Sequence, residues 1–197
     1  MRQRVIGLTG GIATGKTTVA NYLANQYQLP ILDADHYARE AVQPGSQRLL
    51  QIYHRYGPDI LQADATLNRR YLAQIIFQDE GERHWIEALI HPYVRDRLQA
   101  EQQALSSVPI LVMVIPLLFE VKMQDLVSET WVVVCSYHQQ CQRLMQRDQL
   151  TLAEAEARIN AQMPLSLKQA QATVVLENGG DWLTLHQQVD HALQPLG

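Results

Sequence analysis

The sequence has little cysteine: only Cys135 and Cys141 occur among its 197 residues. Two thiols are too few for a disulfide framework, and free thiols suit a reducing compartment. No apolar run reaches the roughly 18 to 20 residues that a membrane-spanning helix needs, and the longest, residues 108–119, contains two prolines. The apolar stretch near the start, Val5 to Leu8, is far too short for a secretory signal. The sequence therefore predicts a cytoplasmic protein that does not enter a membrane.

An excess of basic residues is also missing. The chain has 16 lysines and arginines against 20 aspartates and glutamates, a formal net charge of -4. This balance argues against a nucleic-acid partner bound over the whole molecule, so an anionic ligand must be met by a local group of cations. Apolar residues make up 47% of the chain and charged residues 18%, which suits one folded domain and excludes disorder.

Short apolar runs alternate with stretches that have helical spacing. Uninterrupted apolar runs are typical of strands that are buried on both faces of a parallel sheet. The expected strands are residues 4–8, 31–32, 110–115, 131–135 and 173–176. The expected helices are residues 17–28, residues 35–42, most of 47–107 with breaks at Gly57-Pro58 and His91-Pro92, and three opened by the capping residues Ser136, Thr151 and Asp181. The alternation predicts an α/β fold, in which about five parallel strands are covered by helices on both faces.

Residues Gly10 to Thr17 match the phosphate-binding pattern G-x-x-x-x-G-K-[ST] between an expected strand and an expected helix. Glycines let backbone N–H groups face phosphates, and the helix N-terminus adds the positive end of its dipole. We expect Lys16 to meet the β- and γ-phosphates and the Thr17 hydroxyl to bind Mg²⁺. The residues expected to bind the nucleotide here are Gly11, Ile12, Ala13, Thr14, Gly15, Lys16, Thr17 and Thr18. The alternative is a simple glycine turn between strand and helix.

Two carboxylates, Asp33 and Asp35, stand at the end of the second expected strand. Ligands of parallel sheets bind at the carboxyl ends of the strands, so a carboxylate there can accept the proton of a substrate hydroxyl. We assign Asp33 to this catalytic role and Asp35 to a helix cap or a water-mediated contact with Mg²⁺. The guanine-reading pattern Asn-Lys-x-Asp does not occur, which disfavours a GTPase.

Several segments resemble the dephospho-CoA kinase family, in the family's order and over nearly the whole chain. They are Gly7-Leu-Thr-Gly-Gly-Ile12 with the phosphate-binding loop, Leu32-Asp-Ala-Asp35, Leu67-Asn-Arg69, His91-Pro92, Pro116-Leu-Leu-Phe-Glu120, Gln140-x-x-Arg143-Leu-x-x-Arg147 and Glu177-Asn178. The resemblance implies a P-loop NTPase fold and phosphorylation of the 3′-hydroxyl of dephospho-CoA by ATP, the last step of coenzyme A synthesis. It also implies a core at about residues 1–45, 108–140 and 170–197, a helical CoA-binding region at about 46–107 and a lid at about 141–169.

The resemblance also implies roles for single residues. Arg143 and Arg147 lie four residues apart, on one face of an expected helix. In the family an arginine of the lid contacts the transferring phosphate, and we assign this role to Arg147. We expect Arg143 to bind the nucleotide, and Lys168 is a weaker candidate for the lid cation. Asn178 resembles a residue beside the ATP adenine, although an ordinary Asn-Gly turn is equally expected there. The residues expected to bind dephospho-CoA are Asp33, Arg69, His91 and Arg95 with Tyr93 nearby, and Leu117. The alternatives without a role in binding are that Arg143 and Arg147 are ordinary arginines of a surface helix, and that His91 ends a helical turn before Pro92.

The chain departs mildly from the family pattern. Ala13 and Ala65 stand where the family often has glycine, Thr17 stands where serine is commoner, and Thr173 where aspartate is. No catalytic group is lost, so only the local loop geometry is in question. Another nucleoside or nucleotide kinase, and a P-loop binding protein without turnover, stay open as alternatives, as does the oligomeric state.

Overall fold

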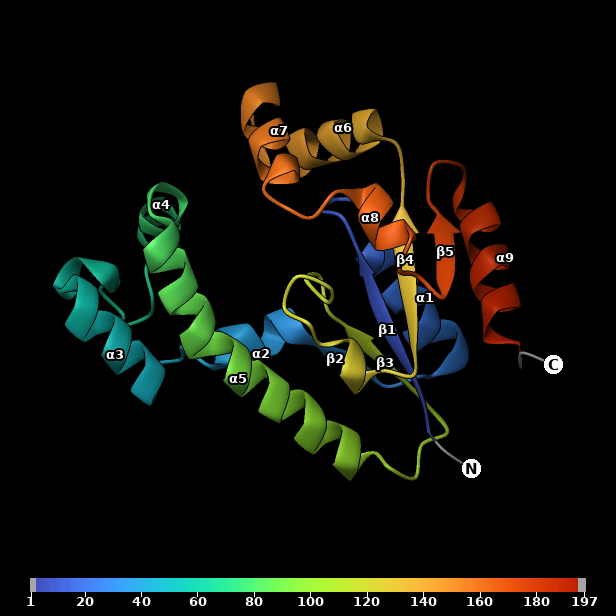
Figure 1. Cartoon of the computed structure of the whole chain (residues 1–197), viewed down its shortest axis with the longest axis horizontal. Helices are drawn as coiled ribbons and strands as arrows, with labels where there is room; N and C mark the ends of the chain where they lie inside the picture. Colours follow the sequence, from blue (N-terminus) through green and yellow to red (C-terminus); the bar gives the residue numbers. More distant parts are fainter. Residues whose placement is uncertain (1–2, 195–197) are drawn as a thin grey trace. The chain divides into compact units, whose positions relative to one another are not determined.

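The computed structural model describes residues 3–194, and its centre is a five-stranded sheet (Figure 1). The strands are β1 (Arg4–Gly10), β2 (Ile31–Asp33), β3 (Ile110–Val114), β4 (Glu129–Val134) and β5 (Val174–Glu177). All neighbours are parallel, in the order β2-β3-β1-β4-β5. Each expected strand is confirmed, with small shifts at the ends.

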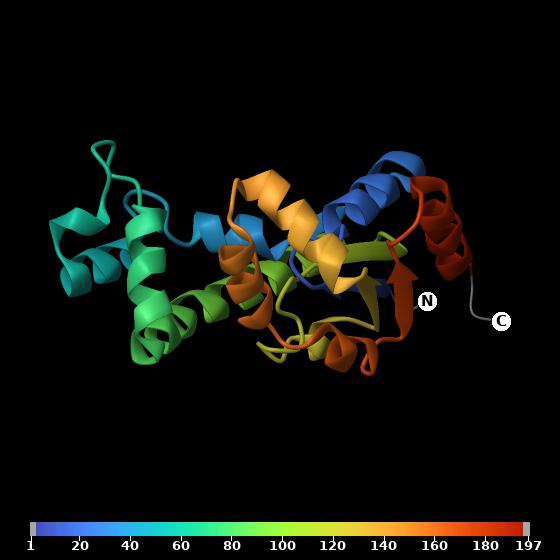
Figure 2. The same cartoon turned by 90° about the horizontal axis from the view of Figure 1, so that it is seen from above.

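Alternate residues of the strands face two different sets of helices. On one face, Leu8, Val112 and Trp131 pack against α1 (Lys16–Tyr27) and α9 (Trp182–Leu193), which lie side by side (Figure 2). On the other face, Val132 and Val134 pack with Phe119 and the segment around α8 (Leu165–Gln169). A doubly covered parallel sheet explains why these strands read as continuous apolar runs. The predicted helices on both faces are confirmed.

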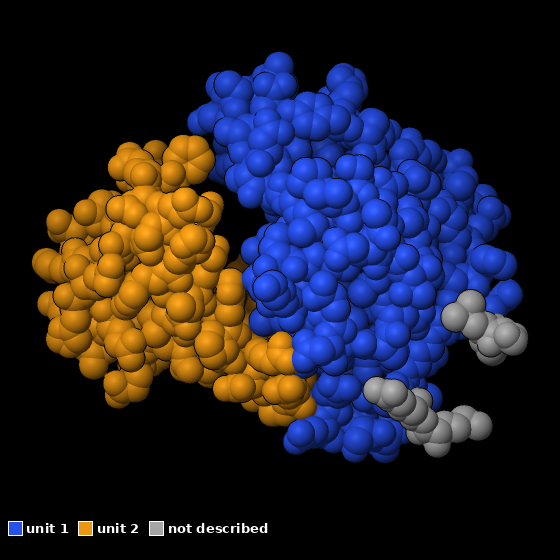
Figure 3. Space-filling view, viewed as in Figure 1, with its two compact units in different colours: residues 1–33, 102–197 blue, residues 34–101 orange. Residues whose placement is uncertain are grey.

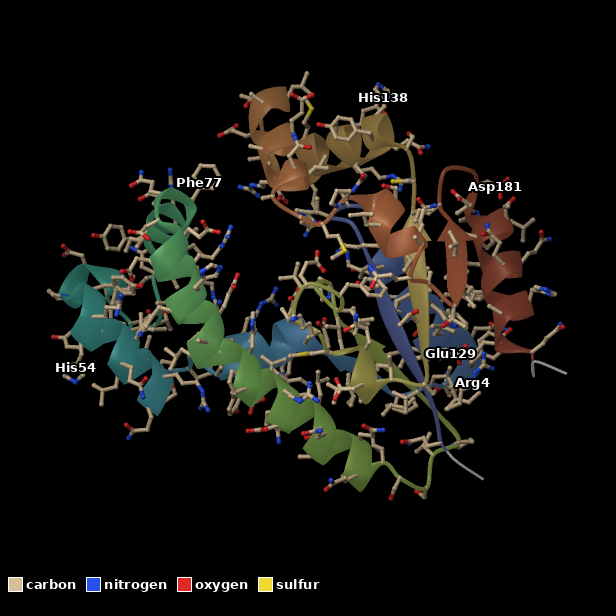
Figure 4. All side chains as sticks on the ribbon, viewed as in Figure 1. Arg4, His54, Phe77, Glu129, His138 and Asp181 are labelled. Atoms are coloured by element: carbon tan, nitrogen blue, oxygen red, sulfur yellow. The ribbon has the colours of Figure 1, made fainter. Side chains whose placement is uncertain are left out.

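The amino ends of β1 and β4 are joined by an ion pair between Arg4 and Glu129 (Figure 4). Glu129 also accepts a hydrogen bond from the buried Trp131 indole at 3.1 Å, and Arg4 donates to the last carbonyls of α9, those of Ala192 and Leu193. These contacts supply hydrogen-bond partners to the buried Glu129 carboxylate at the amino end of β4. They lie at the strand ends opposite to the phosphate-binding loop.

Three helices begin at the capping residues that the sequence indicates. Ser136 and Thr151 open α6 (Tyr137–Asp148) and α7 (Leu152–Asn160) with complete capping boxes, and Asp181 caps α9 at the backbone N–H of Thr184. The short helix α8 was not expected within the lid segment.

The expected break at His91-Pro92 is wrong. A single helix, α5 (Glu80–Ala104), runs through it. Pro92 cannot donate the usual backbone hydrogen bond, but Ile86, Val94 and Leu98 are buried on both sides of it. Burial of this apolar stripe outweighs the lost bond, so packing overrides the local preference.

The chain divides into two compact units, residues 1–33 with 102–197 and residues 34–101 (Figure 3). The second unit holds α2 (Ala34–Glu40), α3 (Gln47–Tyr56), a short 3-10 helix, η1 (Pro58–Ile60), α4 (Arg69–Gln78) and most of α5, around a core of its own. The contacts place residues 34–45 in this helical unit and the lid segment 141–169 in the same unit as the sheet. The predicted division by function into core, CoA-binding region and lid stays a prediction, and its ends at residues 1–2 and 195–197 lie outside the described residues.

A second 3-10 helix, η2 (Gln124–Leu126), precedes β4. Among the helices that the structure describes, none is both long and apolar enough to cross a membrane.

Candidate active site

The phosphate-binding loop joins the end of β1 at Gly10 to the start of α1 at Lys16. Gly15 precedes the helix in a left-handed conformation, with φ of 105°, and it has room for no side chain. A Cβ at this position would lie 2.0 Å from the Asn178 amide nitrogen, which donates a hydrogen bond of 2.7 Å to the Thr14 carbonyl. Gly15 is therefore required both by its backbone angle and by the close approach of Asn178.

Ala13 adopts a left-handed conformation, with φ of 58°. This conformation costs an L-residue with a Cβ roughly 1–2 kcal/mol relative to the right-handed one. Ala65 has the same strain, with φ of 61°. At both positions where the family often has glycine, a glycine would therefore adopt the positive φ angle without steric strain.

The Lys16 ammonium lies along the loop itself. It donates hydrogen bonds to the carbonyls of Gly10 at 3.2 Å and Gly11 at 2.8 Å. Thr17 and Thr18 follow in the first turn of α1, where both side chains are exposed. A cation and the N-terminus of a helix at one point form a site for a polyanion.

Arg143 reaches the loop from α6 through Asn178. One guanidinium nitrogen, Nη2, donates to the Asn178 carbonyl at 2.8 Å, and Asn178 in turn holds Thr14. The other nitrogen, Nη1, is buried and has no partner among the residues that the structure describes. The structure therefore brings Arg143 and Asn178 to the loop, and the unpaired donor fits an oxygen-rich ligand such as ATP.

The other strand ends next to the loop carry Asp33 and Leu117. β3 lies between β1 and β2, and Asp33, the last residue of β2, is in register with Val114 at the end of β3. The Asp33 side chain is exposed, and Leu117 follows β3 by three residues and is half-buried. Both residues therefore lie at the carboxyl edge of the sheet, on the side of the loop. Asp35 stands in the first turn of α2 rather than before the helix.

Arg147 points to the surface of the lid segment, with 58% of its side chain exposed. It donates two hydrogen bonds, of 2.8 and 3.0 Å, to Asp148, which also pairs with Arg158 of α7 at 2.9 Å. The hydrogen bonds and charge of Arg147 lower the pKa of Asp148 below its usual range. In this conformation Arg147 is a member of a surface ion-pair group.

Lys168, the weaker candidate, is fully buried and pairs with Glu120 at 2.8 Å. A lysine in this position cannot reach a phosphate without breaking a buried ion pair.

The residues expected to bind the acceptor lie in the second unit. Arg69 begins α4 and is exposed; partial desolvation together with the charge of Arg39 lowers its pKa. Burial also lowers the pKa of His91, which favours a neutral ring at pH 7, and Arg95 lies one turn further along α5. Tyr93, expected near these residues, has one face of its ring covered, because Arg48 lies 4.3 Å above the ring centre.

Two residues that sequence reasoning missed contact the loop directly. The side chains of Gln140 and Gln162 hydrogen-bond to the backbone of Ile12. Gln140 belongs to a segment that resembles the family, Gln140-x-x-Arg143-Leu-x-x-Arg147, and this resemblance is the one signal that could have pointed to it.

A P-loop between the first strand and helix of a doubly covered parallel sheet defines the class of P-loop kinases and related nucleotide-binding proteins. A dephospho-CoA kinase from Campylobacter jejuni has this fold, with a TM-score of 0.72, 24% identity and coverage of 96% of this chain and 95% of that one. A shikimate kinase from Acinetobacter baumannii has it too, with a TM-score of 0.52, 18% identity and coverage of 98% and 92%.

The chain belongs to the dephospho-CoA kinase family. The model of that family matches residues 4–183. A dephospho-CoA kinase of Trichormus variabilis is 61% identical over 193 residues, which span 98% of each chain. The chain is thus a phosphotransferase of coenzyme A biosynthesis, and membership in the family implies ATP as the phosphate donor.

Proposed function

We propose that the P-loop binds ATP with Mg²⁺ and that Asp33 accepts the proton of the 3′-hydroxyl of dephospho-CoA as the γ-phosphate is transferred to it. The observation that carries this proposal is the loop itself, with Lys16, Asn178 and Arg143 gathered around it in a chain of this family. The cytoplasm is the compartment that we propose for this activity, since two free thiols suit a reducing compartment.

Mg²⁺ fits the side chain that the motif assigns to it. The Thr17 hydroxyl is exposed at the first turn of α1 and makes no hydrogen bond to another described residue, so its oxygen can bind a hard cation. When bound, Mg²⁺ would neutralise charge on the β- and γ-phosphates.

The other residues of the proposed site would bind phosphate oxygens or accept the proton of the acceptor hydroxyl. The Lys16 ammonium would exchange the carbonyls of Gly10 and Gly11 for phosphate oxygens, and Arg143 would offer its unpaired Nη1 to the nucleotide. Asp33 would orient the acceptor hydroxyl and take its proton. Arg147 would leave Asp148 and stabilise the charge on the transferring phosphate when the lid closes.

ADP release tests phosphoryl transfer directly. We expect ADP to form only when ATP, Mg²⁺ and dephospho-CoA are all present, and excess chelator to stop the reaction. Equal release of ADP without an acceptor would indicate hydrolysis, and unchanged turnover in chelator would remove Mg²⁺ from the proposal.

Arg147→Ala should lower kcat and kcat/KM together, with modest change in the dissociation constant of ATP. The reason is that its guanidinium would contact the phosphate only in the closed transition state. Arg143→Ala should instead weaken ATP binding more than it lowers kcat. Arg158→Ala is the matched control, since it loses the same partner, Asp148, without a role at the phosphate. Steady-state kinetics and ATP titrations measure the effects in all three variants. If Arg147→Ala has the kinetic constants of wild type, Arg147 is a surface residue without a role in transfer.

Arg69→Ala should raise KM for dephospho-CoA by about 10- to 100-fold, because a charged hydrogen bond to a phosphate contributes roughly 1.5–3 kcal/mol. KM for ATP should not change. The neighbouring Arg70, also exposed, supplies the control. If Arg70→Ala and Arg69→Ala have the same small effect, Arg69 does not bind the acceptor.

A further inference from the structure

Both hydrogen-bonding groups of one P-loop residue, Ile12, are held by glutamine side chains. The Ile12 N–H donates to the Gln162 side-chain oxygen at 2.8 Å, and the Ile12 carbonyl accepts from the Gln140 side-chain nitrogen at 2.8 Å. Gln140 lies near the start of α6, and Gln162 follows the end of α7. The two ends of the α6–α7 hairpin therefore hold the same residue of the loop. The Ile12 N–H is not available to a phosphate while Gln162 holds it.

The approach of Gln140 requires the glycine at position 11. A Cβ on Gly11 would lie 2.5 Å from the Gln140 side-chain nitrogen. Gln140 has only 4% of its surface exposed, so it has little room to retreat. The contact between Gln140 and Ile12 is thus part of the packed interior and not a chance surface contact.

The backbone next to Gln162 is anchored by the ion pair between Glu120 and Lys168. The next residue along the chain, Met163, donates its backbone N–H to Glu120 at 3.3 Å, and Glu120 pairs with the fully buried Lys168 at 2.8 Å. Lys168 also donates to the Pro116 carbonyl at 3.1 Å. Glu120, which ends the Pro116–Glu120 segment, thereby anchors the turn that carries Gln162.

The residue after Ile12 is Ala13, whose left-handed backbone is strained. Without an opposing force, a loop that contains this alanine would relax toward other conformations and would have to be reordered when a nucleotide binds. Two hydrogen bonds on the adjacent residue supply such a force.

We propose that Gln140 and Gln162 are positioning residues that hold the P-loop backbone in its observed conformation against the strain at Ala13, so that the loop need not be reordered when a nucleotide binds. This inference rests on the proposed nucleotide site at the loop. The glutamines do not touch the nucleotide; they act through the backbone of Ile12.

The test is a titration of the purified full chain with a fluorescent ADP, which reports binding without turnover. Gln162→Ala should bind it about three- to tenfold more weakly, the range expected for the loss of one hydrogen bond. Ala13→Gly in the Gln162→Ala background should restore affinity to within about twofold of the Ala13→Gly protein, since the strain that the bond opposes is then absent. Gln169 lines the same cavity as Gln140 and Gln162, and its side-chain amide makes no hydrogen bond to another described residue, so Gln169→Ala should bind like wild type.

Hydrogen exchange of the nucleotide-free protein gives a second readout, in which amides of the loop should exchange faster in Gln162→Ala than in wild type. Unchanged ADP affinity in Gln162→Ala, or an equal loss with and without the Ala13→Gly change, would overturn the positioning role. If wild type and Lys16→Ala bind ADP equally, the nucleotide site at the loop is itself wrong, and this inference is overturned with it.

Discussion

Lys16→Ala should fold normally, and its kcat should be lower than that of wild type by about 10³-fold or more. In the structure the Lys16 ammonium donates hydrogen bonds to the carbonyls of Gly10 and Gly11 in the loop. Its removal deprives the developing phosphate charge of a cation that stabilises the transition state more than the ground state.

The matched control for Lys16→Ala is Lys122→Ala, which removes an exposed lysine from the loop after β3. Thermal unfolding should show that both variants are folded, and single-turnover kinetics should separate the chemical step from binding. A folded Lys16→Ala protein with normal kcat would exclude the P-loop from the mechanism.

Asp33→Asn should lower kcat by roughly 10²- to 10⁴-fold while the dissociation constant of ATP changes little. Asparagine has nearly the same shape as aspartate but cannot take the proton of the acceptor hydroxyl. Asp33 is exposed at the end of β2, and asparagine keeps the size of the side chain, so stability should be close to that of wild type.

Asp35→Asn is the comparison for Asp33→Asn, because it removes a carboxylate two residues further on, in the first turn of α2. We expect it to reduce kcat much less. A collapse of ATP binding in Asp33→Asn, with little effect on the chemical step, would instead assign Asp33 to the metal.

Local sequence patterns predicted the parts of the fold whose cause is local. The loop from Gly10 to Thr17 follows from glycine geometry and a helix start, and the capping boxes at Ser136 and Thr151 each span only four residues. The continuous helix through Pro92 could not be predicted in this way. The residues that compensate for the proline, Ile86, Val94 and Leu98, are buried by tertiary packing, and Ile86 belongs to the core of the second unit.

The same distinction explains what was missed in the site. Gln140 and Gln162 contact Ile12 across 128 and 150 residues of chain, and no local pattern encodes such a contact. Arg147 was placed on the correct helix by its spacing from Arg143, but its pairing with the adjacent Asp148 was not considered. The strain at Ala13 depends on the φ angle that the folded loop imposes, and the sequence shows only that an alanine stands where the family often has glycine.

The most direct test of the central claim is the acceptor specificity of the purified chain. We predict that, with ATP and Mg²⁺, kcat/KM for dephospho-CoA exceeds that for every member of a panel of nucleosides and nucleotides by at least about 10²-fold, and that mass spectrometry of the product shows one phosphate added at the ribose 3′-position. Comparable phosphorylation of a nucleoside or nucleotide, or ATP binding with no transfer to dephospho-CoA, would contradict the assignment.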